Sequence, residues 1–289
     1  MLRVIGAWLT SRKRCRCPQR QALGYAASMS SLTKRLLAAG RALTRPGRPP
    51  EQPLSPRLVA VAELVPLGAR VADIGTDHGW LPIHLVHTRR AKTAIASDLR
   101  EQPLDGARRR VESHHLSDRI DLRLGSGLTV IAPDEVTTVI IAGMGGRRII
   151  DLITAAPQVI ERLDRVIVQP NTEVARVREQ LRAAGLRLSH EQLVEHAGRW
   201  YPTLAWTPGQ PDAPWSELDH RFGPFLRARA DPQLRRFLGS ELSRVAQALA
   251  RAQRNGARPP ALTALQDELS AIEHELARLA IVAGTIQKS

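Results

Sequence analysis

The chain has 289 residues, of which 43% are hydrophobic, 42 are Lys or Arg and 28 are Asp or Glu, giving a formal net charge of +14. This length and apolar content suit one ordinary domain with a buried core and a smaller second part. No apolar run approaches the roughly 20 residues that a membrane helix needs, so we expect a soluble protein with no membrane partner.

The N-terminal segment, residues 1–53, is a basic leader. Residues 1–50 hold 11 Lys and Arg and no acidic residue, whereas the rest of the chain is only mildly basic. This composition is typical of a disordered arm that contacts a polyanion, or of an over-long leader with no function and a true start at Met29. Both cysteines, Cys15 and Cys17, lie here, so we expect no disulfide in the folded body and a cytoplasmic location. No second Cys pair or His cluster accompanies them, and we predict no metal site.

Residues 54–210 alternate short β-branched runs with amphipathic stretches, a pattern that predicts βαβ units and an α/β, Rossmann-like parallel sheet. The predicted strands span residues 69–75, 92–99, 120–127, 137–145 and 164–171. The predicted helices span residues 79–90, 103–114, 146–160 and 172–185. Two further extended segments, 186–198 and 199–209, are expected to form a closing hairpin. Sheets of this kind bind ligands at the carboxyl ends of their strands.

The stretch VADIGTDHGWLP, residues 71–82, is expected to end a buried strand in a glycine turn. Gly75 and Gly79 allow the backbone to turn sharply and approach a ligand at the N-terminus of the next helix. Asp98 ends the second strand, where a carboxylate can accept both hydroxyls of a ribose. Each glycine alone is equally well explained by packing, but the order of strand, turn, helix, strand and acid predicts a nucleoside cofactor.

Two carboxylates indicate which nucleoside cofactor fits the turn. A dinucleotide site has the pattern G-x-G-x-x-G, whereas here Asp77 takes the middle glycine position and Asp73 ends the strand. Carboxylates repel a diphosphate, but they attract the ammonium and sulfonium groups of S-adenosylmethionine. We therefore predict S-adenosylmethionine rather than a nicotinamide cofactor. Helix capping by Asp77 is a compatible alternative.

Five segments, in this order and spacing, resemble a known family. They are VADIGTDHGWLPIHL, AIASDLREQPLDGAR, RLGSGL, VIIAGMGG and VIVQPN. Together they are similar to the bacterial tRNA (adenine-22 N1)-methyltransferase family. The similarity runs from about Leu54 through RFGPFL, residues 221–226, into a C-terminal helical hairpin. It implies a class I methyltransferase fold, S-adenosylmethionine as methyl donor, a tRNA acceptor and methylation of adenine at N1.

The resemblance also assigns residues to the site. It implies that the methionine end of the cofactor lies at the first turn, the ribose at the end of the second strand, and the reacting base after the fourth. The implied cofactor-binding residues are Asp73, Gly75, Thr76, Asp77, Gly79, Asp98, Leu99, Gly125, Ser126, Gly127, Gly143, Met144 and Gly145. The implied catalytic residues are Asp77, His78, Met144 and Asn171. The chain departs from the family with Ser126 in place of Asp or Asn, Ser97-Asp98 in place of Gly-Glu, and Trp80 in place of Tyr.

The Gly-Met-Gly-Gly segment at 143–146 bears on which atom is methylated. Enzymes that methylate an exocyclic amine commonly hold it with Asn or Asp followed by Pro-Pro-aromatic, and this chain offers no such acceptor. Ring N1 has its own lone pair and attacks without first losing a proton, so the protein mainly positions the base and compensates charge. Asp77 is our candidate for stabilising the cationic product, and His78 is either a proton relay or a structural histidine.

Residues 211–289 predict a helical coiled-coil hairpin that binds tRNA. The predicted seam consists of aliphatic residues spaced three or four positions apart, on both sides of the turn NGARPP. These residues are Leu242, Val245, Leu249 and Ala252 before the turn, and Leu262, Leu265, Leu269, Ile272, Leu276 and Leu279 after it. Residues 216–258 hold nine Arg and four acidic residues, which favours RNA contact over a packing or dimer role. Because pairing hides adenine N1, the target must be unpaired or flipped.

Two other functions stay open from the sequence. One is a class I methyltransferase that acts on a different acceptor, either rRNA or a protein. The other is an RNA-binding member of the fold without turnover, for which Ser126 is the residue in question. A nicotinamide enzyme is less favoured because the pyrophosphate loop is missing. The oligomeric state is not predicted.

Overall fold

Seven strands form a single sheet in the order β3-β2-β1-β4-β5-β7-β6. The strands are β1 (Ala69–Ile74), β2 (Ala91–Asp98), β3 (Ile120–Leu124), β4 (Thr138–Met144), β5 (Arg165–Pro170), β6 (Leu186–His196) and β7 (Arg199–Pro208). The first five are parallel, whereas β7 runs antiparallel to β5 and β6. The predicted parallel sheet with a closing hairpin is therefore confirmed.

The computed structural model describes residues 53–210 and 213–286, with side chains as far as residue 282. The basic leader predicted at 1–53, with its two cysteines, lies outside the described residues except for its last position. Within the described part, no helix is both long and apolar enough to cross a membrane.

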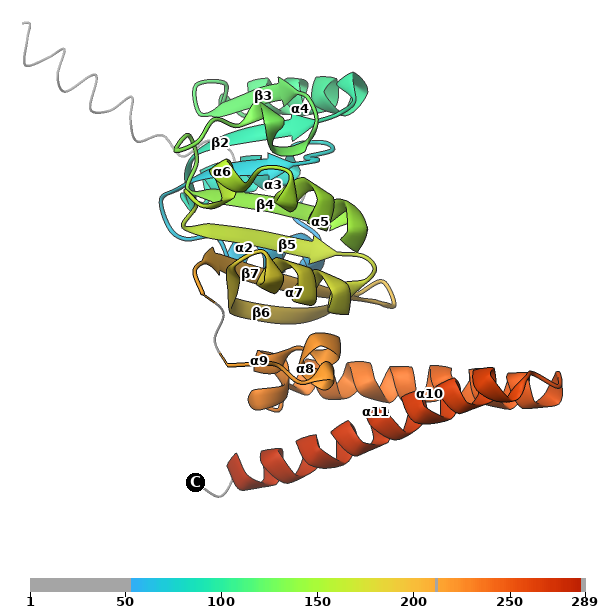
Figure 1. Cartoon of the computed structure of the whole chain (residues 1–289). Helices are drawn as coiled ribbons and strands as arrows, with labels where there is room; N and C mark the ends of the chain where they lie inside the picture. The colour runs from blue at the N-terminus through green and yellow to red at the C-terminus, as the bar shows by residue number, and fades with distance from the viewer. Residues whose placement is uncertain (1–52, 211–212, 287–289) are drawn as a thin grey trace, which may run out of the picture. The chain divides into compact units, whose positions relative to one another are not determined.

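Helices cover both faces of the sheet (Figure 1). The helices α2 (Pro56–Glu63), α3 (Trp80–His87) and α4 (Glu101–Ser113) pack on one face. On the other face lie η1 (Gly127–Val130), α5 (Gly146–Thr154), α6 (Pro157–Ile160) and α7 (Val174–Ala183). Strands buried on both faces need apolar residues at successive positions, which explains the continuous runs of Val and Ile in β4 and β5.

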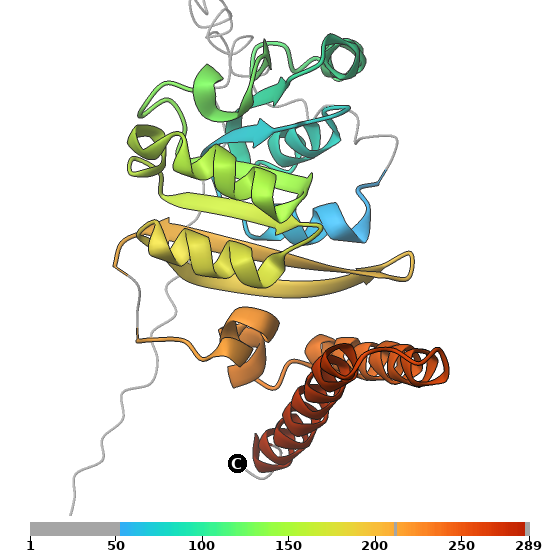
Figure 2. The same cartoon turned by 45° about the vertical axis from the view of Figure 1, so that its right-hand side comes forward.

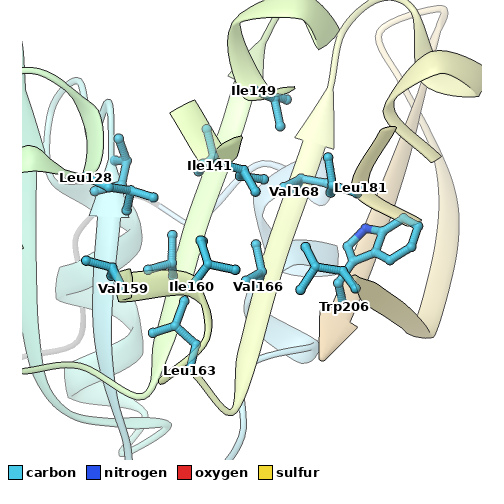
Figure 3. Close-up of a cluster of buried hydrophobic side chains, with 14 of the residues drawn as sticks. Leu128, Ile141, Ile149, Val159, Ile160, Leu163, Val166, Val168, Leu181 and Trp206 are labelled. Atoms are coloured by element: carbon cyan, nitrogen blue, oxygen red, sulfur yellow. The ribbon is translucent and has the colours of Figure 1, made fainter. Parts of the chain in front are cut away.

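The side chains of β4 alternate between two cores. Val139 and Ile141 contribute to the core under α5 to α7, whereas Ile140 contributes to the core under α2 to α4. Figure 3 shows Ile141 in the first core, which extends along the sheet to Trp206 of β7. The two cores hold β4 rigidly, and β4 leads directly into the Gly-Met-Gly-Gly segment.

Parallel pairing brings the ends of three strands to one edge of the sheet. In the register of β1, Ile74 is opposite Ser97 of β2 and Ile141 of β4. The residues that follow these positions therefore meet at the carboxyl edge, as the sequence predicts for a ligand site.

One predicted helix is wrong in its extent. The segment 146–160 is not a single helix, because α5 ends at Thr154 and the separate short helix α6 begins at Pro157. Proline has no N–H to donate and disfavours a helical residue before it, and Ala156 accordingly has φ −132° and ψ 52°. Most other predicted elements begin and end within three residues of the observed ones.

Four helices follow the sheet: α8 (Glu217–Phe222), α9 (Pro224–Ala228), α10 (Pro232–Arg254) and α11 (Pro259–Ile286). Figure 2 shows α10 and α11 as two long helices that are joined by a turn. Most of the predicted seam residues belong to one cluster: Val245, Ile272 and Leu279 are buried, and Leu242, Leu265, Leu269 and Leu276 are partly buried and pack against them. Leu249, Ala252 and Leu262, nearer the turn, are only partly buried and lie outside that cluster. The helical hairpin is present, and a domain boundary at 210/211 stays a prediction.

A buried ion pair joins α7 and β6 to the first of these helices. Arg178 Nη2 donates to Glu191 Oε2 at 3.1 Å, and its Nη1 donates to the backbone oxygen of His220 at 2.9 Å. The other carboxylate oxygen of Glu191 accepts the backbone N–H groups of Phe225 and Leu226 at 2.7 and 3.0 Å. The side chains of Arg178 and Glu191 are 2% and 0% exposed. Removing one partner would leave the other charge buried without compensation.

We expect Glu191→Gln to lower the free energy of unfolding by about 3 to 5 kcal/mol, because a buried guanidinium loses its counter-charge. The matched control is Glu195→Gln on the same strand, whose ion pair with Arg236 is partly exposed on both sides, and it should cost less than about 1 kcal/mol. Urea unfolding measures both. Equal, small losses would show that the buried pair contributes little.

Candidate functional site

A cavity of about 560 Å³ opens at the carboxyl edge of the sheet. Its volume lies in the range of small-molecule and cofactor sites. Its walls come from the ends of β1, β2 and β4, from the segment after β3, and from α2, α3, η1 and α5. Of the residues predicted for the site, those that line it are Asp73, Gly75, Thr76, Asp77, His78, Asp98, Leu99, Gly125, Gly127, Gly143 and Met144. Gly79, Ser126, Gly145 and Asn171 do not line it.

The turn after β1 depends on two glycines. Gly75 has φ +76°, and the backbone N–H groups of Gly75 and Thr76 both donate to the Ser97 oxygen, at 2.8 and 2.9 Å. A Cβ on Gly75 would overlap Met144 Cε. Gly79 has φ +75°, and a Cβ there would lie 3.0 Å from the Cβ of Ala107. Gly75 therefore keeps the cavity open beside Met144, whereas Gly79 allows α4 to pack closely against the start of α3.

Asp73 is a buried carboxylate at the bottom of the cavity. It is 4% exposed, and its Oδ2 accepts a hydrogen bond from Thr76 Oγ1 at 2.7 Å. Desolvation by burial raises the pKa of Asp73 to about 6, although Thr76 and the positive charge of Arg57 oppose the rise. A carboxylate that is this poorly solvated is stabilised when a cation binds beside it.

Asp98 lies at the end of the neighbouring strand and is 7% exposed. Its Oδ1 accepts the backbone N–H of Arg100 at 3.0 Å, and its backbone oxygen accepts the N–H of Gly125 at 3.0 Å. These contacts fix the carboxylate in the cavity wall. Leu99 beside it is 56% exposed, so an apolar surface borders the acid, as a ribose and an adjoining aromatic ring would require.

Asp77 and His78 lie at the mouth of the cavity. Their side chains are 65% and 51% exposed, and His78 Nε2 is 3.7 Å from Asp77 Oδ1. The α3 helix begins after Gly79 with no side-chain cap, so the capping alternative for Asp77 is wrong. The loop is held instead by Arg110, which donates to the His78 backbone oxygen at 3.2 Å and stacks over the Trp80 ring at 4.7 Å.

The segment after β3 contributes two glycines and not the serine between them. A Cβ on Gly125 would overlap Val130, and one on Gly127 would overlap Leu152. Ser126 is exposed, and its backbone oxygen accepts from Thr129 Oγ1 at 2.7 Å. The departure from the family at Ser126 therefore concerns a side chain outside the cavity wall.

Several wall residues are not among those predicted for the site. Arg57, Arg100, Arg148 and Leu152 all line the cavity. Arg57 comes from α2, and its Nη1 donates to Gln169 Oε1 at 2.8 Å. The sequence gives only a weak signal for Arg57, because it lies in a separate helix before the glycine turn and its spacing from that turn matches no binding motif.

The part of the chain that the structure describes has no side chains grouped as a metal centre requires. Within residues 53–210 and 213–286, no group of three or more His, Cys, Asp or Glu side chains is arranged to hold a metal ion. The described residues that line the cavity are acids, arginines, one histidine, two hydroxyl residues and apolar groups around a glycine-rich backbone.

The chain is similar to known methyltransferases. The sequence model of the family described as "Methyltransferase domain" matches residues 54–204. The tRNA (adenine(22)-N(1))-methyltransferase of Bacillus subtilis is 37% identical over 180 residues, which are 61% of this chain and 76% of that protein.

Two solved structures share the fold. A Streptococcus pneumoniae protein in complex with S-adenosyl-L-methionine has a TM-score of 0.70 and 33% identity, covering 78% of this chain and 100% of that chain. TrmK of M. capricolum, in complex with S-adenosyl-homocysteine, has a TM-score of 0.68 and 25% identity, covering 78% of this chain and 99% of that chain. By sequence and by fold, the chain belongs to the tRNA (adenine(22)-N(1))-methyltransferase family.

Proposed function

We propose that the protein transfers a methyl group from S-adenosylmethionine to ring N1 of an adenine in tRNA, in the cytoplasm. The observation that carries the proposal is the cavity itself, in which a buried carboxylate, a second acid and a glycine-rich turn meet at one edge of the sheet. The Bacillus subtilis and Streptococcus pneumoniae relatives support the acceptor atom, and the S. pneumoniae and M. capricolum structures, which hold S-adenosyl-L-methionine and S-adenosyl-homocysteine, support the cofactor.

The residues of the cavity fit S-adenosylmethionine. Among the described residues, the buried Asp73 carboxylate has no charged hydrogen-bond partner, and a cationic amino-acid group beside it would offset its desolvation. Asp98 provides the second carboxylate, toward the ribose hydroxyls. Gly125 and Gly127 line the cavity beside Asp98, where a flat ring would lie, and both must be glycine because a Cβ would overlap Val130 or Leu152.

The acceptor side of the cavity suits a ring nitrogen. When bound, S-adenosylmethionine supplies an electrophilic methyl group on a sulfonium. The wall at the end of β4 consists of Ala142, Gly143 and Met144, so this segment offers no side-chain acceptor for an exocyclic amine. Adenine N1 attacks with its own lone pair, and the protein's contribution is to position the base and exclude water.

The mouth of the cavity is the place where the product charge develops. Methylation at N1 leaves the adenine ring positively charged. The exposed carboxylate of Asp77 lies at this mouth with φ +52°, a conformation that Asn also tolerates. We assign Asp77 to the stabilisation of that charge, with His78 beside it as a group that can accept a proton.

The helical hairpin supplies a basic surface for tRNA that is smaller than the arginine count predicts. Five of the nine arginines form ion pairs within the protein: Arg221, Arg227, Arg229, Arg236 and Arg244. In the described chain, Arg251, Arg254 and Arg258 at the turn between α10 and α11 are exposed and form no ion pair. We propose that these three residues, the tip arginines, contact phosphates of the folded tRNA.

Methyl transfer tests the proposed function. Purified protein, labelled S-adenosylmethionine and unmodified tRNA should give 1-methyladenosine on nucleoside analysis. Label in another nucleoside, or in rRNA or protein but not in tRNA, would contradict the proposal. Retained S-adenosylhomocysteine binding without transfer to any of these acceptors would favour the RNA-binding alternative.

We expect Asp73→Asn to stabilise the free protein while it weakens the binding of the cofactor. The pKa of Asp73 is about 6 when folded, against an ordinary 3.8, so the folded state holds the proton more tightly and stability falls as pH rises through this window. At pH 7 the neutral side chain should add up to about 3 kcal/mol to the free energy of unfolding.

Urea unfolding and calorimetry measure these two effects. The Asp73→Asn variant should bind S-adenosylhomocysteine at least about 10-fold more weakly, since the amide cannot form a charge-assisted hydrogen bond with the ligand's ammonium group. The matched control, Asp77→Asn, should keep both stability and affinity but slow methyl transfer. An Asp73→Asn protein with unchanged affinity would remove Asp73 from the cofactor site.

We expect replacement of the three tip arginines by Gln to weaken tRNA binding. At about 0.1 M salt the Kd should rise about 10-fold or more. The slope of log Kd against log salt concentration should fall by about one for each phosphate that the protein no longer neutralises. The control is Arg244→Gln on the same helix, which is paired with Glu241 and should change the Kd less than about 2-fold. Filter binding across a salt series measures both, and equal effects would contradict the assignment.

A further inference from the structure

The end of β4 contains a bulge that shapes the acceptor side of the cavity. Ala142 is opposite Gln169 and Met144 is opposite Pro170, so Gly143 is an extra residue in the ladder with β5. Gly143 has φ +78°, a conformation that favours glycine. Bulges next to active sites redirect the side chains that follow them. Here the residue that follows is Met144, which lines the cavity.

Asn171 holds this bulge with two hydrogen bonds. Its side-chain Nδ2 donates to the Gly143 oxygen at 2.8 Å, and its backbone N–H donates to the Met144 oxygen at 2.8 Å. The two successive carbonyls of the bulge therefore both accept hydrogen bonds from Asn171, which follows β5. Asn171 itself does not line the cavity, so its geometry indicates an action on the backbone of the bulge.

A buried glutamine and an arginine orient Asn171 in turn. Gln169 is 0% exposed, and its Nε2 donates to Asn171 Oδ1 at 3.3 Å. Gln169 Oε1 accepts from Arg57 Nη1 at 2.8 Å. An arginine can only donate and the Gly143 carbonyl can only accept, so the direction of both amides between them is fixed. The result is a polarised hydrogen-bond chain from Arg57 through Gln169 and Asn171 to Gly143.

Arg57 is itself held in place against the same bulge. Its guanidinium carbon lies 5.7 Å from the centre of the Tyr201 ring, a cation–π distance. A Cβ on Gly143 would lie 3.2 Å from Arg57 Nη1, so the guanidinium also packs directly on the bulge. Arg57 therefore connects α2 to β4, β5 and β7 at the place where the methyl acceptor must be positioned.

We propose that Arg57 is a positioning residue for methyl transfer, acting through the polarised chain to fix the bulge at Gly143 and Met144. The inference rests on the proposed function, since the bulge is the wall against which the base would be aligned. A reacting base displaced by about 1 Å loses about 100-fold in rate. A hydrogen-bond chain that holds two consecutive carbonyls limits that displacement, and none of its hydrogen bonds involves Asp73 at the cofactor end.

Two substitutions each remove a different hydrogen bond of the polarised hydrogen-bond chain. Gln169→Glu is nearly isosteric and keeps the acceptor for Arg57, but it removes the N–H that donates to Asn171. Arg57→Met keeps the apolar stem and removes the donor. Both should lower the single-turnover rate at saturating tRNA by about 10- to 100-fold. Neither should weaken S-adenosylhomocysteine binding by more than about 3-fold, because Gln169 does not line the cavity and the charge of Arg57, which acts on Asp73, has the same sign as the ligand's ammonium group.

The matched control is Arg165→Met. Arg165 Nη1 donates to the backbone oxygen of Leu64 at 2.8 Å, so it ties the end of α2 to β5 outside the cavity. This variant should lower the Tm and leave the rate unchanged. An unchanged rate in a folded Arg57→Met protein would overturn the proposal. A raised KM for tRNA with normal kcat, as a phosphate contact would give, or a parallel loss of S-adenosylhomocysteine affinity, would also overturn it.

A substrate-free measurement separates this inference from the proposed function. In ¹⁵N spectra, Gln169→Glu should shift the side-chain amide signals of Asn171 and speed their exchange with solvent. Unchanged Asn171 signals would contradict the hydrogen-bond chain whatever reaction the protein performs. Wild-type protein that fails to methylate any acceptor would instead contradict the proposed function, while the spectra still report on the chain.

Discussion

Parallel pairing of β1 with both β2 and β4 is the constraint on which the site depends. Because the three strands share one direction and register, their ends open at a single edge, and the turn after β1 is bonded to the end of β2 through Ser97. Cores on both faces hold the strands in place, so the loops need little order of their own. A shift of one residue in β1 would send Asp73 to the opposite face of the sheet.

The site carries costs that the rest of the fold offsets. Asp73 is buried as an acid that forms no ion pair among the described residues, and Gly143 adopts a left-handed conformation in a bulge that leaves the sheet ladder incomplete. Neither feature stabilises the free protein. Both features favour the binding of a cationic cofactor and a flat base in the cavity. Such a loss of stability in favour of ligand binding is expected at a functional site.

Much of this arrangement could be predicted because the relevant residues directly follow strands in the chain. Asp73, Gly75 and Asp98 are examples, since each lies at or just after a strand end that the periodicity locates. Arg57 could not be found in this way, because it contacts Gln169 across 112 residues of sequence. The basic character of the hairpin was overestimated for the same reason: acids outside the counted segment, such as Glu275, neutralise its arginines.

A crystal structure of the protein with S-adenosylhomocysteine is the most direct test of the account. We expect the amino-acid end of the ligand at Asp73, the ribose hydroxyls at Asp98, and the sulfur facing Gly143 and Met144. A ligand bound in the reverse direction, or outside the cavity at the carboxyl edge, would contradict the account. In either case, the buried acid and the glycine bulge would need a different explanation.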